Sequence, residues 1–138
     1  MMPAYDYSWI DGYIGIPYLY NGDSRKGMNC YHLVKTVFKE QLDVELPDWK
    51  ASADTIAASV RALSGHIDEE IREKRAIEIA DPIDFDIAIA TTRGLHHHMG
   101  IYIAGGILHA ARGYHSRWDR LDIFCSMHHP VRFFRWPI

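Results

Sequence analysis

Cys30 stands out for chemistry because it follows a strong helix-start signal. Asn29 is a good N-cap, and Leu33, Val34 and Val37 then recur at helical spacing. A cysteine in the first turn of a helix faces the positive end of the helix dipole, which favours the thiolate and lowers the pKa of the thiol. The sequence therefore offers Cys30 as a nucleophile, and the alternative is a small buried hydrophobe, the role of most lone cysteines.

Residues 96–111, HHHMGIYIAGGILHAA, contain two histidines that a hairpin could bring together. Gly105–Gly106 is a turn signal between two alternating apolar runs. With a two-residue loop, His98 and His109 share one face as direct or diagonal neighbours, whereas a three-residue loop separates them. Along the first strand of this hairpin, alternation places Met99, Ile101 and Ile103 on the face opposite His98.

The histidine pair is compatible with three kinds of site. It could be a general base with its orienting partner, a set of zinc ligands or a polar outer face. A zinc site would use His96 or His98 together with His109 and His115, but the sequence shows no firm fourth ligand. Cys125 is expected to be an inert core thiol. Three further histidines are expected in exposed loops: His115, His128 and His129.

Helices are predicted in the first half of the chain. The first begins after Asn29, runs to Leu42 and is closed by Pro47. Residues 52–64 predict a second helix with a stripe of apolar residues, and residues 67–76 predict a short charged helix with ion pairs at i,i+4.

Strands are predicted in the second half, where the apolar pattern changes to a period of two. The clear candidates are residues 86–91, 99–103 and 107–111, and the weaker ones are 121–125 and 131–136. Helices followed by a meander of strands are typical of the α+β class, with helices packed on a small antiparallel sheet. The length of 138 residues predicts one domain over 1–138.

Composition excludes several partner classes. The net charge of −3 and the scattered basic residues argue against nucleic acid. No apolar run approaches the roughly 20 residues of a membrane span. The first twelve residues, MMPAYDYSWIDG, have no basic region followed by an apolar run, so we expect no secretory signal. The two cysteines do not make a disulfide framework, which leaves at least one thiol unpaired.

Three stretches together resemble the NlpC/P60 family of papain-like cysteine peptidases. They are GIPYLYNGDSRKGMNCYHLV, DIAIA and HHMGIYIAGGILHAA, and the resemblance covers roughly residues 12–111. The segment NCYHLVKTVFKEQLDVELPDW and the closing FFRW look closest to the branch found in bacteriophage and prophage tail proteins. The resemblance implies the papain-like NlpC/P60 fold within the α+β class.

The resemblance also implies roles for four residues. Cys30 matches the nucleophile, His98 the general base, and His109 the third residue that fixes the imidazole and its tautomer. Tyr18, taken alone a core or turn aromatic, matches the tyrosine that helps to hold the oxyanion with the backbone N–H of Cys30. We choose His98 from the run of three histidines because it directly precedes the Met-Gly-Ile-Tyr strand. The implied acyl transfer needs no metal or organic cofactor.

This chain departs from the usual family pattern at four positions, none of which carries a catalytic group. Asn29 stands where the family usually has Asp, and His32 stands where it usually has Gly. Phe85 replaces the Gly before the Asp of the first strand, and Asn21 replaces one of two paired glycines. His32 lies close to the nucleophile along the helix, so we expect it to narrow the substrate groove.

The family resemblance implies the peptide part of bacterial peptidoglycan as the substrate. We expect a cysteine endopeptidase that acts as a component of a phage tail tip, held by other tail proteins and assembled in the host cytoplasm. That location would also account for the absence of a secretory signal. The alternative is a structural or assembly component of the tail tip, built on the same fold without turnover. An acyltransferase or amidase is less favoured, because lipid-directed relatives usually carry the His before the Cys.

Overall fold

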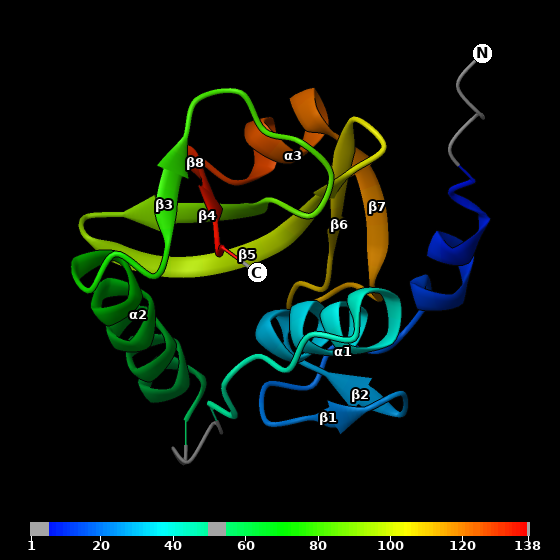
Figure 1. The fold of residues 1–138 in the computed structure, drawn as a ribbon. Helices are drawn as coiled ribbons and strands as arrows, with labels where there is room; N and C mark the ends of the chain where they lie inside the picture. Colours follow the sequence, from blue (N-terminus) through cyan, green and yellow to red (C-terminus); the bar gives the residue numbers. More distant parts are fainter. Residues whose placement is uncertain (1–5, 50–54, 138) are drawn as a thin grey trace.

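The computed structural model describes residues 6–49 and 55–137, and within them the strands form two antiparallel sheets (Figure 1). The smaller sheet pairs β1 (Asp23–Ser24) with β2 (Gly27–Met28). The larger sheet has six strands in the order β3-β8-β4-β5-β6-β7. Its strands, in chain order, are β3 (Ile77–Ile79), β4 (Ile87–Thr92), β5 (Leu95–Ile103), β6 (Gly106–His109), β7 (Arg117–Arg120) and β8 (Val131–Arg135).

The helices cover both sides of the larger sheet. Figure 1 shows α1 (Cys30–Leu42) and α2 (Ile56–Arg72) on one side, with α3 (Leu121–Met127) beyond the far side. A short 3-10 helix, η1 (Ser8–Tyr13), precedes them. No helix among the described residues is both long and apolar enough to cross a bilayer. This arrangement is the α+β class that the sequence predicts.

The main core forms where α1 packs on β5. The apolar face of α1 buries Leu33 and Val37 completely, and the facing side of β5 contributes Met99, Ile101 and Ile103. Burial of each such side chain contributes about 1.5–3 kcal/mol, so α1 is held firmly at the sheet. Met99, Ile101 and Ile103 were predicted to share one face of the strand, and this is confirmed because all three lie in the main core. The first turn of α1 is thereby fixed beside the middle of β5.

The two helices predicted over residues 52–64 and 67–76 are in fact one helix, α2. Gly65 lies inside it, where a Cβ would meet nothing within 4 Å, so no steric requirement breaks the helix there. Ser64 and Ile67 on either side of that glycine are both buried, which keeps one continuous face against the sheet. Residues 52–54 of the prediction lie outside the described residues.

The strand predicted over residues 121–125 is wrong, because this segment forms α3. The alternating residues Leu121, Ile123 and Cys125 suggested a strand, but Phe124 is the buried side chain of the segment. Phe124 packs with Ala88 and other residues in a second, smaller core on this side of the sheet. The prediction over 131–136 is confirmed by β8, whereas β3 and β7 were not predicted.

A partly buried ion pair links the last strand to the start of β4. Arg135 of β8 donates Nε–H and Nη2–H to the two carboxylate oxygens of Asp86, at 2.7 and 2.8 Å. Such two-point contacts fix orientation as well as distance. Phe85, next to Asp86, adopts φ +74°, the left-handed region that favours glycine. The side chain of Phe85 stacks on Trp9 and meets Phe38 edge-on, which offsets this backbone strain.

Candidate active site

Cys30 is the first residue of α1, as predicted. The Oδ1 atom of Asn29 accepts a hydrogen bond from the backbone N–H of His32 at 2.8 Å, which is the expected N-cap geometry. The amide of Asn29 also donates to the carbonyl of Tyr20 at 2.9 Å. These two bonds fix the direction of the helix start and therefore the position of the thiol.

The environment of the Cys30 thiol differs from the sequence-based expectation. Burial raises the pKa of Cys30 to about 11, although hydrogen bonding to the backbone N–H groups of Met99, Tyr31 and Cys30 itself acts in the opposite direction. The expected lowering of this pKa by the helix dipole is therefore wrong, because loss of hydration outweighs the favourable dipole. At neutral pH the group is a thiol, so any nucleophilic reaction at this sulfur would require a base to take its proton.

Tyr18 lies beside the start of α1. It forms an isolated parallel bridge with Met28, and the adjacent backbone makes two further bonds, from Met28 N–H to the carbonyl of Pro17 and from Leu19 N–H to the carbonyl of Met28. Burial, followed by repulsion from the Cys30 thiolate that forms at high pH, raises the pKa of Tyr18 to about 12. Its hydroxyl therefore stays protonated at neutral pH and can donate a hydrogen bond.

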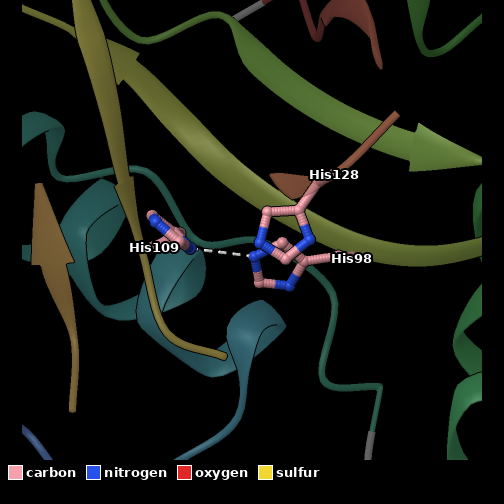
Figure 2. A group of neighbouring side chains, drawn as sticks. All are labelled: His98, His109 and His128. Atoms are coloured by element: carbon pink, nitrogen blue, oxygen red, sulfur yellow. Dashed lines mark hydrogen bonds between the residues drawn. The ribbon is translucent and has the colours of Figure 1, made fainter. Parts of the chain in front are cut away.

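The β5–β6 hairpin brings the two predicted histidines together. Its two-residue loop is Ala104–Gly105, at φ +53° and +78°, rather than the predicted Gly105–Gly106. Gly106 instead begins β6, where a Cβ would come within 2.4 Å of the backbone of Asp119. The loop length is as predicted, so His98 and His109 share a face as diagonal neighbours. Their ring nitrogens, Nε2 of His98 and Nδ1 of His109, are 2.9 Å apart (Figure 2).

Asp119 of β7 extends this pair into a chain of three groups. Its Oδ2 atom lies 2.7 Å from Nε2 of His109 and 2.8 Å from Nε of Arg117. Burial raises the pKa of Asp119, but the hydrogen bonds from His109 and Arg117 outweigh burial and lower it overall. Asp119 is therefore an ionised carboxylate at neutral pH, which accepts hydrogen bonds and donates none.

The Asp119 carboxylate determines the tautomers along the chain. Because Asp119 accepts only, Nε2 of His109 must carry a proton, which leaves Nδ1 of the neutral His109 ring as an acceptor. Nε2 of His98 must then donate to that atom. In a neutral His98 this leaves Nδ1 with its lone pair, the state that a general base needs. The order of donors thus runs from His98 through His109 to Asp119.

Both histidines are neutral at rest. Burial, followed by the nearby imidazoles of His109 and His128, lowers the pKa of His98 well below its usual value. Burial also lowers the pKa of His109, although the carboxylate of Asp119 works against this shift. His98 and His109 are 6% and 1% exposed, so water screens this chain of groups very little.

His128 also belongs to this cluster, contrary to its prediction as an exposed loop residue. It is the C-cap of α3 and is half-buried, with its ring stacked on that of His98 at 4.3 Å between centroids. The N–H of His128 donates to the carbonyl of Phe124, so the fold of α3 positions this ring. The predicted exposure of His115 and His129 is confirmed.

The zinc arrangement considered from the sequence does not form. His96 bonds to Asp68 and Thr91 instead, and His115 is exposed next to Pro17. Among the described residues, the group that could hold a metal is His98, His109 and His128. Cys125 is a free, partly buried thiol that packs against the smaller core.

A pocket of about 390 Å³ opens over the cluster. Its lining includes the four side chains Tyr18, Cys30, His98 and His128, so the thiol and the imidazole of His98 line one common space. His32 is not among the described residues that line it, and the narrowing expected from His32 is not seen. Aromatic and cationic groups complete the walls, notably Tyr31, Trp49, His66 and Arg112.

Sequence reasoning missed Asp119 and His128. The pairing rule used for the first hairpin could have found Asp119, since β7 pairs with β6 and places Asp119 diagonally from His109. No local pattern points to His128, because its approach to His98 depends on the unpredicted helix α3.

The model of the NlpC/P60 family matches residues 15–123, which is more than half of the chain. The chain belongs to the NlpC/P60 family. The family resemblance is thereby confirmed, while its phage-tail branch is not distinguished by this match. No curated protein sequence matches the chain significantly.

Solved structures confirm the NlpC/P60 fold. The NlpC/p60 domain of the peptidoglycan hydrolase SagA aligns with a TM-score of 0.59 and 18% identity, over 94% of this chain and 92% of that one. NlpC1 from Trichomonas vaginalis aligns with a TM-score of 0.60 and 18% identity, over 91% of this chain. An NlpC/P60 family protein from Bacillus cereus ATCC 10987 aligns with a TM-score of 0.61 and 17% identity, over 92% of this chain. The present chain spans 40% and 37% of the last two proteins.

Proposed function

We propose that this NlpC/P60 protein is a cysteine endopeptidase that hydrolyses peptide bonds in the stem peptides of bacterial peptidoglycan. The observation that carries the proposal is that Cys30 and His98 line the same pocket. His98 is oriented by its hydrogen bond to His109, which is bonded in turn to Asp119. A nucleophile, a base and an orienting group in this order are the parts that acyl transfer requires.

The first step joins the Cys30 sulfur to the peptide carbonyl carbon. The thiol proton moves to Nδ1 of His98, and the Nε2–H of the resulting imidazolium donates to His109, which Asp119 supports in turn. The C–N bond then breaks as His98 returns the proton to the leaving amine. A water molecule, deprotonated by the same imidazole, hydrolyses the thioester and regenerates the thiol.

The negative oxygen of the tetrahedral intermediate needs hydrogen-bond donors. The backbone N–H of Cys30 lies in the first turn of α1, where N–H groups have no partner inside the helix. The hydroxyl of Tyr18 lines the same pocket and keeps its proton at neutral pH. One backbone donor and one side-chain donor are sufficient for an oxyanion hole.

The pocket walls support a peptide substrate that carries a carboxylate. Arg112 is exposed at the pocket and can pair with such a group. Trp49 stacks on His66 with centroids 5.0 Å apart and provides a flat apolar wall for the substrate chain. SagA, a peptidoglycan hydrolase by name, carries a domain of the same fold, which favours wall peptide over other peptides.

Digestion of purified peptidoglycan tests this function. The products should contain a new free amine and a new carboxylate within the peptide, with the sugar chain intact, and mass spectrometry identifies both. Products cut only in the sugar chain, or no products with any stem-peptide type, would contradict the proposal.

We also propose that the protein works as a component of a bacteriophage tail tip. The support is the resemblance of residues 29–49 and of the closing FFRW to the tail-associated branch of the family. Peptide mapping of purified virions from an infected or induced host should detect this polypeptide in the tail fraction. Virions that lack this polypeptide would contradict the tail-tip location but not the hydrolase activity.

A non-catalytic structural component of the tail tip remains the second candidate. The observation that favours it is the buried Cys30, whose pKa is raised to about 11. Under this alternative, the pure protein would assemble into tails but release no peptide from any wall preparation.

A further inference from the structure

Three imidazoles lie close together at the pocket that also contains the proposed nucleophile. His98 comes from β5, His109 from β6, and His128 from the end of α3. One ring nitrogen of each residue lies within 4.8 Å of the corresponding atoms of the other two. Figure 2 shows the rings of His98 and His128 stacked, with a nitrogen of each directed toward His109.

His128 is the member of this cluster that the proposed acyl transfer does not use. Its Nε2 atom is buried and has no hydrogen-bond partner among the described residues. A buried ring nitrogen without a hydrogen-bond partner is unfavourable, and a ligand that binds it removes this cost. A metal ion that accepts its lone pair would satisfy it.

The chemistry of the cluster suits zinc or a similar divalent transition metal. All three rings are held neutral, since burial lowers each of their pKa values, that of His128 to about 4. Neutral imidazole is the form that binds metal. Asp119 holds the far nitrogen of His109, an arrangement that orients metal-bound histidines in many sites. The positive charge of Arg117 weakens the site, but Arg117 is paired with Asp119.

Metal binding requires modest changes in the spacing of the three nitrogens, which now lie within 4.8 Å of one another. Zinc–nitrogen bonds of about 2.0–2.1 Å in a tetrahedron place the nitrogens about 3.3 Å apart. The Nε2 atom of His98 and the Nδ1 atom of His109 are 2.9 Å apart, so a bound ion would separate them slightly. His128 is the C-cap of α3, and one of its ring nitrogens lies within 4.8 Å of the ligand nitrogens of the other two histidines. The fourth position is left for water.

We propose that His98, His109 and His128 form an inhibitory binding site for Zn²⁺. Binding through Nε2 of His98 ends the hydrogen bond to His109 and moves the proton of the neutral His98 ring to Nδ1. The nitrogen that would accept the Cys30 proton then has no lone pair, so attack stops. The proposal has two halves. The binding half, that zinc binds to these histidines, does not depend on the proposed peptidase function, whereas the inhibition half, that bound zinc stops turnover, rests on it.

Direct titration tests the binding half. Chelator-treated wild-type protein, titrated with Zn²⁺ against a chromogenic chelator, should bind one equivalent. His128→Gln should lower the affinity by about 10-fold or more, as loss of one of three ligands implies. His129→Gln, an exposed neighbour, is the matched control and should bind as wild type does. Equal affinity in wild type and His128→Gln, or binding of no zinc, overturns the proposal.

A spectroscopic reading keeps the test decisive if His128→Gln fails to fold. Co²⁺ added to the wild-type protein should give the intense visible absorption of a tetrahedral site, and Zn²⁺ should displace it. A weak, octahedral spectrum overturns the proposed coordination.

Turnover measurements test the inhibition half. Each variant is compared with its own metal-free rate on a soluble stem peptide. Zn²⁺ should inhibit wild type reversibly, and His128→Gln should need at least about 10-fold more metal, in line with its weaker binding. Loss of turnover on chelation would overturn the proposal, because the metal would then be required. If no hydrolysis is found under any condition, the proposed peptidase function is wrong, while the zinc titration still measures binding at the histidine cluster.

Discussion

Two histidines of β5, only two residues apart, belong to networks of opposite character. His96 uses both ring nitrogens, one at 2.7 Å from Oδ1 of Asp68 and the other at 2.7 Å from Oγ1 of Thr91. His98 uses Nε2 for His109, and no hydrogen bond to its Nδ1 atom is found among the described residues. The His96 network is closed, whereas the His98 network ends in a nitrogen that can accept a proton.

A bulge in the β4–β5 pairing separates the two networks. His98 pairs with Ala90 and His96 with Thr91, so His97 is the extra residue of the bulge. His96 then meets α2 through Asp68, and its N–H donates to Ser64 of the same helix. His98 instead meets the α3 side and lines the pocket. The comparison shows that the fold decides which histidine of the run HHH can act as a base.

Replacing each histidine in turn gives the largest expected contrast. His98→Gln should lower kcat/KM by about 10³-fold, because it removes the general base. His96→Gln should keep most of the activity but lower the free energy of unfolding by about 1–3 kcal/mol, since it removes the hydrogen bonds of a buried side chain to Asp68 and Thr91. Steady-state kinetics and urea unfolding measure the two effects. Loss of activity in His96→Gln, with activity kept in His98→Gln, would show that the general base has been assigned to the wrong histidine.

The two aspartates that support these histidines provide a finer contrast. Asp119→Asn should lower kcat by about 10–100-fold, because an amide can present a donor to His109 and reverse the tautomers of the chain. Asp68→Asn should change kcat less than about twofold, since its partner His96 does not line the pocket. Equal losses in the two variants would mean that Asp119 acts through the fold alone.

Acid sensitivity of the fold should also follow the His98 network. The folded protein holds the pKa of His98 well below its usual value, so the unfolded chain binds more protons as the pH falls through about 6.5. Stability should therefore be full above that pH and decrease toward pH 5. His98→Gln should show a shallower decrease in urea unfolding over the same range. An unchanged slope would show that His98 is not the buried neutral group.

The parts of the molecule that could be predicted from sequence are those set by local rules. The N-cap at Asn29 and the helix after it depend on neighbouring residues, and both were correct. The two-residue loop of the hairpin, once its length was chosen, fixed the common face of His98 and His109. The loop itself lies one residue earlier than predicted. Ala104 adopts the left-handed conformation, and Gly106 belongs to β6, where a Cβ would clash with the ring of Trp118.

The parts that could not be predicted depend on long-range packing and on burial. The pKa of Cys30 is raised because the assembled core removes water from the thiol, an effect that no helix-start pattern contains. His128 joins the site because Phe124 anchors α3 in the smaller core. Phe85 occupies a backbone conformation suited to glycine, and only its aromatic neighbours explain why it is tolerated.

The central claim is that Cys30 is the nucleophile, and one pair of variants tests it most directly. Cys30→Ala removes the sulfur with little change in volume, and Cys125→Ala removes the other free thiol as a matched control. Release of soluble fragments from peptidoglycan, followed by mass spectrometry at equal folded protein, should be abolished in Cys30→Ala and unchanged in Cys125→Ala. Hydrolysis by Cys30→Ala at the wild-type rate would contradict the account.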